Sequence, residues 1–238
     1  MHKLSVIVPV FNEAEAIPEL FERLVRSCSE YAPFEIVAID DGSTDGSYES
    51  LADQRKLYPD AEIRIIRFRS NSGKSDALDA GFRAAKGNLI ATIDADLQNP
   101  PEEISKLISA LGSHALSAGK RIKREDTVFK RFASRFANFI RRKLLTDNAS
   151  DTACGLKVFR KEALRELPMF KGMHRFFPAL LRMKGFSVIE VEVQDAFRRY
   201  GNSKYGTFSR GIPGFFDMLA VYWMRKRKLT YEIKSYDR

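Results

Sequence analysis

Short runs of β-forming residues alternate with longer stretches of helical periodicity through the first part of the chain. The runs cover Leu4–Val10, 34–40, 62–68 and 88–94, and the stretches between them cover 13–29, 44–57 and 74–86. Helices that connect successive strands in this way place the strands parallel to one another, with helices on both faces of the sheet. The apolar character of the runs predicts strands buried on both faces. The sequence therefore predicts an α/β fold with a mostly parallel sheet.

The second part of the chain has a different pattern, in which aromatic and basic residues share the same segments. We predict a strand at 115–119, a helix at 173–184, a half-exposed strand at 187–193 and a polar turn at 198–205. A helix at 127–145 would carry a stripe of Phe and Ile on one face and arginines on the other, as helices lying in a membrane surface do. A core helix is the alternative. The tail at 208–228 repeats the pattern, so the C-terminal part is expected to contain amphipathic membrane-surface helices.

Basic residues are concentrated in particular segments of this 238-residue chain. Lys and Arg number 40 against 31 for Asp and Glu, and the segment 120–143 alone holds ten basic and two acidic residues. A second basic run covers 225–228. Such runs indicate contacts with the phosphates of anionic lipid or of nucleic acid, or else a solvated helix face. The single Trp offers little base stacking, so we expect an anionic membrane surface and no nucleic acid as the partner.

Two further features bear on where the protein is expected to act. Cys28 and Cys154 form no CxxC pair, which fits a reducing compartment and suggests neither a zinc site nor a disulfide framework. No leader-like segment precedes the first strand, and the apolar stretch 211–224 is shorter than a spanning helix. We therefore expect a peripheral protein at the cytoplasmic face of a membrane, without a transmembrane segment.

Polar residues follow three of the predicted strands. They cover 9–13, Asp40 with Asp41, and 94–98. Ligands of parallel α/β sheets bind at the carboxyl ends of the strands, so these clusters should meet at one edge. Asp94 and Asp96 would repel each other without a cation, and carboxylate oxygens suit Mg²⁺ or Mn²⁺. A divalent ion held there could bridge the protein to a diphosphate, as transfer from a nucleotide sugar requires.

Three other motifs do not meet the requirements of the sites that they suggest. The segment 72–75 ends like a phosphate-binding P-loop, but Phe68 stands where its leading Gly should be. The segment 41–46 begins like a calcium loop, but Ala52 replaces the required Glu, so we read it as a helix-capping turn with Asp41 free to bind a ligand. No GxGxxG follows the first strand. ATPase, calcium-binding and dinucleotide oxidoreductase functions are therefore not supported.

Six segments, taken in order and spacing, resemble the family-two glycosyltransferases of the GT-A (Rossmann-like) fold, and among them the polyprenyl-phosphate sugar synthases typified by dolichol-phosphate mannosyltransferase. They are 8–13 (VPVFNE), 40–46 (DDGSTDG), 71–74 (NSGK), 94–98 (DADLQ), 117–121 (SAGKR) and 199–205 (RYGNSKY). The resemblance covers nearly the whole chain. It implies one domain over 1–238, with a nucleotide-sugar-binding half at 1–120 and an acceptor-binding, membrane-associating half at 121–238.

The resemblance also implies roles for individual positions. Residues around the donor nucleoside would be Pro9, Phe11, Glu13, Ile39 and Asp41, with Phe11 at a position that is Tyr in many relatives. The donor and metal segment would comprise Asp94, Ala95, Asp96 and Gln98, of which Asp94, Asp96 and Gln98 are the implied ligands of Mg²⁺ or Mn²⁺. Donor phosphates would meet Arg121, Arg198 and Lys204, with Asp96, Arg198 and Lys204 as the catalytic set. The acceptor phosphate would meet Arg121, Arg131 and Ser134, and the sugar pocket would involve Asp151, Thr152 and Gly155.

The nature of the acceptor decides whether a general base is needed. The histidines His2, His114 and His174 lie outside every polar cluster of the sequence, so none is assigned as a base. A phosphate monoester is largely dianionic at neutral pH and already nucleophilic. This favours inverting transfer from a UDP- or GDP-sugar to a polyprenyl phosphate, undecaprenyl or dolichyl. The alternatives are transfer to a hydroxyl of a lipid-linked glycan or polysaccharide, and a catalytically silent binder. Attachment would use the basic aromatic helix and tail, or a membrane-protein partner.

Overall fold

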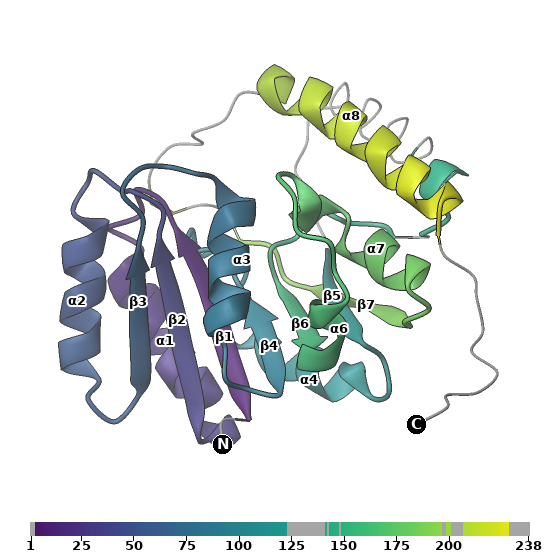
Figure 1. The fold of residues 1–238 in the computed structure, drawn as a ribbon. Helices are drawn as coiled ribbons and strands as arrows, with labels where there is room; N and C mark the ends of the chain where they lie inside the picture. The colour runs from purple at the N-terminus through teal and green to yellow at the C-terminus, as the bar shows by residue number, and fades with distance from the viewer. Residues whose placement is uncertain are drawn as a thin grey trace, which may run out of the picture.

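The computed structural model describes residues 3–122, 141, 143–147, 149–196, 199–200 and 207–228. Within these residues, seven strands form a single sheet in the order β3-β2-β1-β4-β6-β5-β7 (Figure 1). The strands are β1 (Leu4–Val10), β2 (Phe34–Asp40), β3 (Glu62–Arg67), β4 (Leu89–Thr92), β5 (Leu116–Arg121), β6 (Lys157–Arg160) and β7 (Val188–Val193).

The strand order reverses at the centre of this sheet. β1 pairs in parallel with β2 on one side and with β4 on the other, because the chain moves outward to β3 and then returns. β6 is antiparallel to both β4 and β5, and β5 pairs in parallel with β7. The expected mostly parallel α/β sheet is therefore confirmed. In sheets of this kind, ligands bind outside the carboxyl ends of the strands at such a reversal, which here are the ends of β1 and β4.

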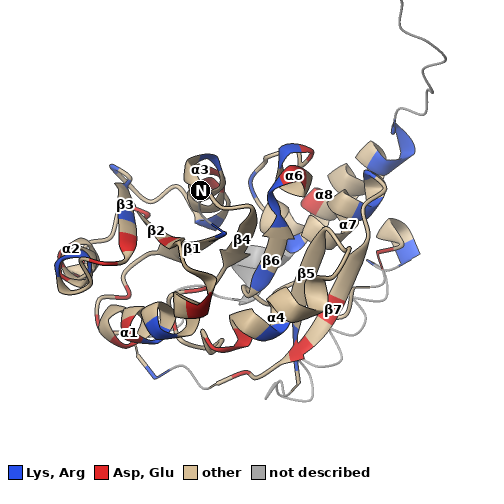
Figure 2. Ribbon diagram, turned by 90° about the horizontal axis from the view of Figure 1, so that it is seen from below, with Lys and Arg blue, Asp and Glu red and all other residues tan. Residues whose placement is uncertain are grey.

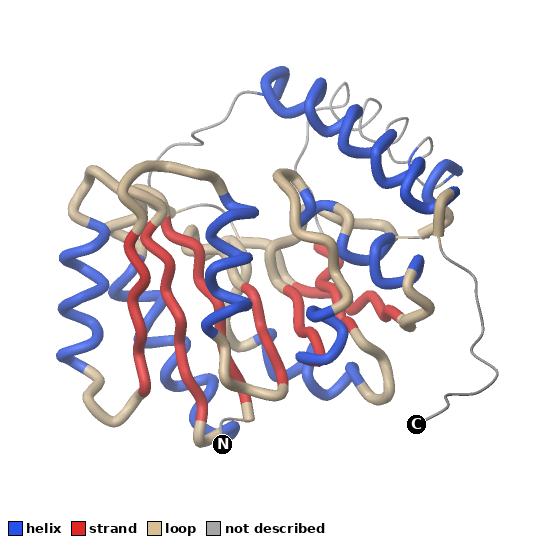
Figure 3. Tube along the Cα trace, in the orientation of Figure 1, coloured by secondary structure: helices blue, strands red, loops and turns tan. Residues whose placement is uncertain are grey.

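Helices cover both faces of the sheet (Figures 2 and 3). One face is covered by α1 (Ile17–Cys28), α2 (Ser47–Leu57) and α4 (Glu103–Leu111), and the other by α3 (Lys74–Ala84), α6 (Lys161–Arg165) and α7 (Phe177–Met183). Side chains of β1 alternate between the two cores, since Val6 and Val8 face the first and Ile7 the second. α3 approaches β1 closely, because a Cβ at Gly81 would lie 2.4 Å from the Cγ2 atom of Ile7.

Several local expectations differ from the structure. β3 is an edge strand in which Ile63 alone is fully buried, so the expectation of burial on both faces is wrong for this strand. The expected helix at 173–184 is divided into a 3₁₀ turn, η2 (Met173–Arg175), and α7. A second 3₁₀ turn, η1 (Ser29–Tyr31), follows α1. Three further elements, β6, α4 and α6, were not predicted from the sequence. β6 has only four residues and begins with Lys157, a poor signal for a buried strand.

The last described element is α8 (Thr207–Lys226), which covers most of the aromatic and basic tail at 208–228. In Figure 1 it lies at the top, on the side where the loop between β3 and α3 also lies. Most of the expected helix at 127–145 lies outside the described residues. No helix in the described part of the chain is both long enough and apolar enough to span a membrane.

Candidate active site at the carboxyl edge of the sheet

The loops after β1 and β2 are joined by hydrogen bonds between side chains and backbone. The backbone N–H of Asn12 donates to Ser43 Oγ at 3.0 Å, and the N–H of Thr44 donates to Asn12 Oδ1 at 2.8 Å. The N–H of Glu13 donates to Ser47 Oγ at 2.9 Å. Asn12 adopts a left-handed conformation, with φ of 53°, that an Asn tolerates better than most residues. These bonds hold the predicted nucleoside segment 9–13 against the turn after β2.

The two adjacent acids at the end of β2 serve that turn. Asp40 Oδ1 accepts the N–H of Ser43 at 2.9 Å, as the turn-forming interpretation of the motif expects. Asp41 Oδ1 accepts the N–H of Ser72 at 2.7 Å, and its Oδ2 accepts the N–H of Gly73 at 2.8 Å and Asn71 Nδ2 at 2.9 Å. The sequence suggested that Asp41 is free to bind a ligand, but its carboxylate already accepts three hydrogen bonds within the protein. Its carboxylate ties the β2 turn to the loop before α3.

Burial sets the protonation preference of Asp41. Desolvation outweighs the two backbone N–H donors and raises the pKa of Asp41 above its ordinary value. The turn also needs Gly42, because a Cβ there would lie 2.5 Å from the backbone carbon of Ser70 and the residue has φ of +69°. This corner of the site is therefore fixed by close backbone contact.

Asp94 follows β4 and is contacted from two sides. Lys74, the first residue of α3, places its Nζ 2.5 Å from Asp94 Oδ1. On the other side, a Cβ at Gly155 would lie 2.3 Å from Asp94 Oδ2, so a larger residue there would displace this carboxylate. Burial disfavours the charged form of Asp94, but Lys74 outweighs it and the pKa of Asp94 is lowered. The Gly155 carbonyl in turn accepts the Thr92 hydroxyl at 2.7 Å, which fixes this wall to β4.

The other predicted metal ligands lie in the same short segment. Asp96 and Gln98 are both half-buried, and Asp96 Oδ1 accepts the Gln98 backbone N–H at 3.3 Å. Carboxylate and amide oxygens are the hard ligands that Mg²⁺ and Mn²⁺ prefer, so the donor set fits such an ion. Among the described residues no group of three or more His, Cys, Asp or Glu side chains surrounds one point. A cation bound to the two aspartates would therefore complete its coordination with Gln98, water or phosphate oxygens.

Two residues near Asp94 were not assigned to the site from the sequence. Lys157 is 3% exposed and its Nζ donates to the Cys154 carbonyl. His174 lies beside the start of α3, with Nδ1 2.9 Å from Ser75 Oγ. His174 lies outside every polar cluster of the sequence, and the fold brings it to the start of α3. Lys157 belongs to the strand that the sequence analysis missed, and 80 residues separate His174 from Asp94.

Ser75 links His174 to the turn that carries it. Ser75 Oγ accepts the backbone N–H of Gly172 at 2.9 Å and lies at hydrogen-bond distance, 2.9 Å, from His174 Nδ1. Burial, followed by the charges of Lys74 and Arg175, lowers the pKa of His174 to about 2. His174 is therefore neutral at physiological pH, and so low a pKa makes it a weak general base.

Arg121, at the end of β5, forms a bidentate ion pair with Asp151. Its Nε and Nη2 donate to the two carboxylate oxygens of Asp151 at 2.7 and 3.1 Å. Burial alone would lower the pKa of Arg121, but Asp151 outweighs it and raises the pKa. Glu190 accepts the N–H groups of Ser150 and Asp151 and so holds the loop. A predicted phosphate contact and a predicted sugar-pocket residue are thus direct partners, which their sequence positions did not indicate.

The remaining predicted site residues are placed as follows. Pro9, Phe11 and Glu13 are half-buried around the end of β1, and Ile39 is fully buried in β2. Ala95 is buried between the two aspartates, and Thr152 is half-buried beside Asp151. Four predicted residues lie outside the described part of the chain, namely Arg131, Ser134, Arg198 and Lys204.

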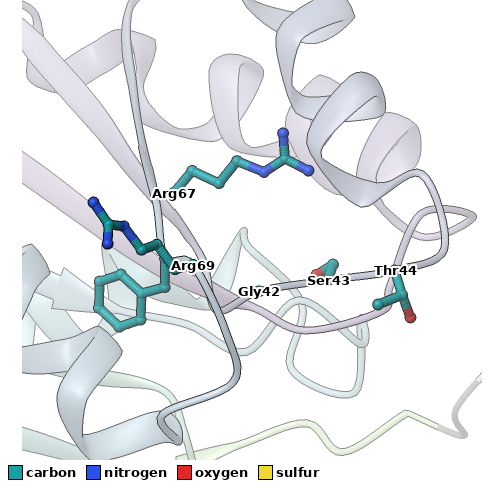
Figure 4. A pocket seen from close by; sticks show the side chains of 6 residues that line it. Gly42, Ser43, Thr44, Arg67 and Arg69 are labelled. Carbon is teal, nitrogen blue, oxygen red and sulfur yellow. The ribbon is translucent and has the colours of Figure 1, made fainter.

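An open pocket of about 410 Å³ lies at the outer end of this edge, lined by Gly42, Ser43, Thr44, Arg67, Phe68 and Arg69 (Figure 4). Arg67 and Arg69 point to opposite sides of the β3 end in this view. Arg67 stacks 4.0 Å over the Tyr48 ring and lies 3.3 Å from Asp40. None of the lining residues is a predicted metal or phosphate ligand. Neither Asp94 nor Lys74 lines this pocket.

Comparisons with solved structures agree with this fold. A mannosyltransferase from Pyrobaculum calidifontis, solved with GDP-Man and Mn²⁺, is 21% identical with a TM-score of 0.67, over 97% of this chain and 66% of that chain. Glucosyl-3-phosphoglycerate synthase from Mycobacterium tuberculosis, solved with Mn²⁺, UDP-Glc and phosphoglyceric acid, is 19% identical with a TM-score of 0.65, over 94% of this chain and 79% of that chain. The expected GT-A fold is confirmed.

Sequence comparisons identify the family. Undecaprenyl-phosphate 4-deoxy-4-formamido-L-arabinose transferase from Proteus mirabilis is 36% identical over 221 residues, 92% of this chain and 67% of that protein. The protein of the same name from Photorhabdus laumondii is 35% identical over 219 residues, 91% of this chain and 67% of its own. This chain thus spans about two thirds of the length of these relatives. The model of glycosyl transferase family 2 matches residues 5–168, and the chain belongs to that family.

Proposed function

We propose that this chain is an inverting glycosyltransferase that moves a sugar from a UDP- or GDP-linked donor to a polyprenyl phosphate. The observation that carries the proposal is the 36% identity, along 92% of the chain, to a transferase that acts on undecaprenyl phosphate. The geometry supports it, because acids and cations that suit a diphosphate meet at the carboxyl edge of the sheet. We assign donor binding to the half at 1–120 and acceptor binding to the half at 121–238.

The residues of the chain would divide the work between binding and charge neutralisation. Asp94, Asp96 and Gln98 would hold Mg²⁺ or Mn²⁺, and such an ion stabilises the charge that develops on a leaving diphosphate. Arg121 would contribute further N–H donors beyond the two that bind Asp151, since a guanidinium carries five. Arg198 and Lys204 are assigned the same role on the strength of their motif. Asp41 would act by holding the loop that presents Lys74.

The acceptor explains why a general base is unnecessary. The second pKa of a phosphate monoester is about 6, so the lipid phosphate is mostly dianionic at pH 7. One of its oxygens forms a bond to the anomeric carbon while the bond from that carbon to the donor diphosphate breaks, with inversion. The electron pair leaves with the diphosphate, and no proton is transferred. Positioning and electrostatic stabilisation then account for catalysis.

The proposal is tested with a panel of radiolabelled UDP- and GDP-sugars, including nucleotide-linked 4-deoxy-4-formamido-L-arabinose, and undecaprenyl or dolichyl phosphate. We expect label in an organic-extractable, acid-labile product that needs Mg²⁺ or Mn²⁺. Label that appears only in a product stable to mild acid would instead favour transfer to a hydroxyl. If no donor labels any lipid, the acceptor assignment fails.

We also assign α8 to an anionic membrane surface. Four of the six large exposed hydrophobic side chains among the described residues lie on it: Phe215, Phe216, Leu219 and Trp223. These positions share one side of the helix, while Met218 and Val221 face the core. Basic residues 225–228 gather at the C-terminal end of the helix (Figure 2). An apolar face next to cations is what an interfacial helix requires.

α8 is connected to the candidate site through the turn that carries His174. A Cβ at Gly172 would lie 2.2 Å from Asp217 Oδ2, so α8 contacts this turn closely. His174 in the same turn contacts Ser75 at the start of α3, next to Lys74. A membrane under α8 would therefore lie on the same side of the molecule as the site that must receive a lipid phosphate.

The single Trp makes this membrane contact measurable. Trp223 is 62% exposed, so its fluorescence should shift to shorter wavelength when vesicles with anionic phospholipid are added. Neutral vesicles should produce a smaller shift, and high salt should reverse it. Cosedimentation of a variant with Phe215 and Phe216 both changed to Ser should be weaker. Equal binding of this variant and the wild type would contradict the assignment of α8.

A further inference from the structure

The ion pair between Lys74 and Asp94 joins two loops that come from different parts of the sheet edge. Lys74 Nζ lies 2.5 Å from Asp94 Oδ1, and the two side chains are 32% and 30% exposed. The pair is therefore half-buried, and part of each side chain remains accessible to an entering ligand. It occupies one of the two oxygens of a predicted metal ligand.

Gly155 packs against the second carboxylate oxygen of Asp94. A Cβ at this position would lie 2.3 Å from Asp94 Oδ2, so the carboxylate takes up the space that a larger residue would need. The backbone of Lys74 is constrained, because the preceding N–H groups of Ser72 and Gly73 both donate to Asp41. The flexible part of this arrangement is the lysine side chain itself. A movement of the ammonium group alone is therefore enough to release Asp94 Oδ1.

We propose that Lys74 is an internal cation that competes with the divalent metal ion for Asp94. In the protein without donor, the ammonium group neutralises Asp94 and weakens metal binding. A nucleoside diphosphate offers phosphate oxygens as alternative partners for Lys74, which frees Asp94 for the metal ion. Metal and donor are then taken up together. The inference rests on the proposed function, because it requires Asp94 to be a metal ligand.

Electrostatic repulsion explains why Lys74 weakens metal binding. A divalent ion bound to Asp94 Oδ1 would lie next to the ammonium group, and the two cations would repel each other. Moving Lys74 to a phosphate removes that repulsion and restores an ion pair. By linkage, the diphosphate must strengthen metal binding by the same factor by which the metal strengthens diphosphate binding.

The test measures Mn²⁺ binding without any turnover, from the free-Mn²⁺ signal in electron paramagnetic resonance. Without nucleotide, we expect Lys74→Gln to bind Mn²⁺ about tenfold more tightly than the wild type, within the usual range of coupling between sites. Lys56→Gln is the matched control, because Lys56 pairs with Asp53 at 3.0 Å on the exposed surface and its loss changes the net charge equally. Lys74→Arg keeps the cation and should bind Mn²⁺ as the wild type does.

Nucleotide and a second-site variant complete the experiment. UDP or GDP should tighten Mn²⁺ binding to the wild type and to Lys56→Gln, and less so to Lys74→Gln. Adding Asp94→Asn to Lys74→Gln should remove the gain. The inference is overturned if Lys74→Gln binds Mn²⁺ no more tightly than Lys56→Gln, if Lys74→Arg gains as much, or if the gain survives without Asp94. If no variant binds Mn²⁺ even with nucleotide, the metal requirement in the proposed function fails as well.

Discussion

Two carboxylates at opposite edges of the same sheet are paired with cations in different ways. Glu35, near the amino end of β2, is fully buried and accepts four hydrogen bonds: from Ser5 Oγ at 2.5 Å, the Lys86 N–H at 2.6 Å, and Arg64 Nε and Nη2 at 3.0 and 2.6 Å. Asp94, at the carboxyl edge, is 30% exposed and meets the single ammonium of Lys74. A carboxylate whose oxygens already accept several hydrogen bonds within the protein stabilises the fold, whereas a carboxylate held by a movable lysine can exchange partners.

The largest effect should come from removing an acid at the carboxyl edge. We expect Asp96→Ala to lower metal-dependent release of UDP or GDP about a thousandfold, because a bound cation contributes several kcal/mol of charge stabilisation to the transition state. The thermal midpoint should change little, since Asp96 is half-buried. Asp53→Ala, which removes an exposed acid from α2, should leave nucleotide release unchanged. Nucleotide release at the wild-type rate in Asp96→Ala would show that this edge does not work as we propose.

At the amino edge, the expected effect is on stability. Glu35→Gln keeps the shape of the side chain but loses the charge that Arg64 requires, so we expect the free energy of unfolding to fall by about 3 kcal/mol. Urea denaturation measures this directly. Nucleotide release by the folded variant should remain at the wild-type rate. A loss of turnover without a loss of stability would reverse the comparison between the edges.

The sequence signal was strong for main-chain architecture and weak for partners across the sheet. Leu4–Val10 and its neighbours are apolar runs of strand length, so their positions were predictable, and Asp94 and Asp96 follow one of them directly. The Lys74–Asp94 pair depends on the side-by-side placement of β1 and β4, which no local pattern encodes. Arg121 and Asp151 meet because β6 folds back between β4 and β5, and that four-residue strand was missed. The roles of Arg131, Ser134, Arg198 and Lys204 stay predictions.

The pH dependence of stability should distinguish Glu35 from acids that accept fewer hydrogen bonds. Burial opposes ionisation of Glu35, but Ser5, the Lys86 N–H and Arg64 outweigh it and lower its pKa below the ordinary value of 4.5. Its stabilising contribution is therefore present above that value and is lost as the pH falls through the folded-state pKa. The difference in unfolding free energy between wild type and Glu35→Gln should shrink from pH 7 towards pH 3. A constant difference over this range would contradict the ion-pair explanation.

Asp41 tests whether the role of a carboxylate depends on the number of hydrogen bonds that it accepts or on the edge of the sheet at which it lies. It lies at the carboxyl edge, yet it accepts three hydrogen bonds from residues 71–73. Asp41→Asn would turn an amide NH₂ towards N–H donors, so we expect a loss of about 2 kcal/mol in unfolding free energy. Urea denaturation of Asp41→Asn and Asp53→Asn side by side provides the measurement and its control. If Asp41→Asn is as stable as Asp53→Asn, the number of hydrogen bonds that a carboxylate accepts is not what distinguishes these acids.

The smallest effect is expected at Lys157, a buried cation at the carboxyl edge. Met in its place keeps the apolar stem and removes the cost of burying a charge, while the Cys154 carbonyl loses its donor. These effects oppose each other, so the unfolding free energy of Lys157→Met at pH 7 should lie within about 1 kcal/mol of the wild type.

Burial is the main cause that lowers the pKa of Lys157, so the folded protein releases this proton more easily than the unfolded chain. Wild-type stability relative to Lys157→Met should therefore rise from pH 7 towards pH 10. Lys161→Met, which also removes a lysine that donates to a carbonyl, is the control for this measurement. A pH-independent loss as large as that of Glu35→Gln would mean that Lys157 stabilises the fold as the amino-edge ion pair does, and the two edges would no longer differ.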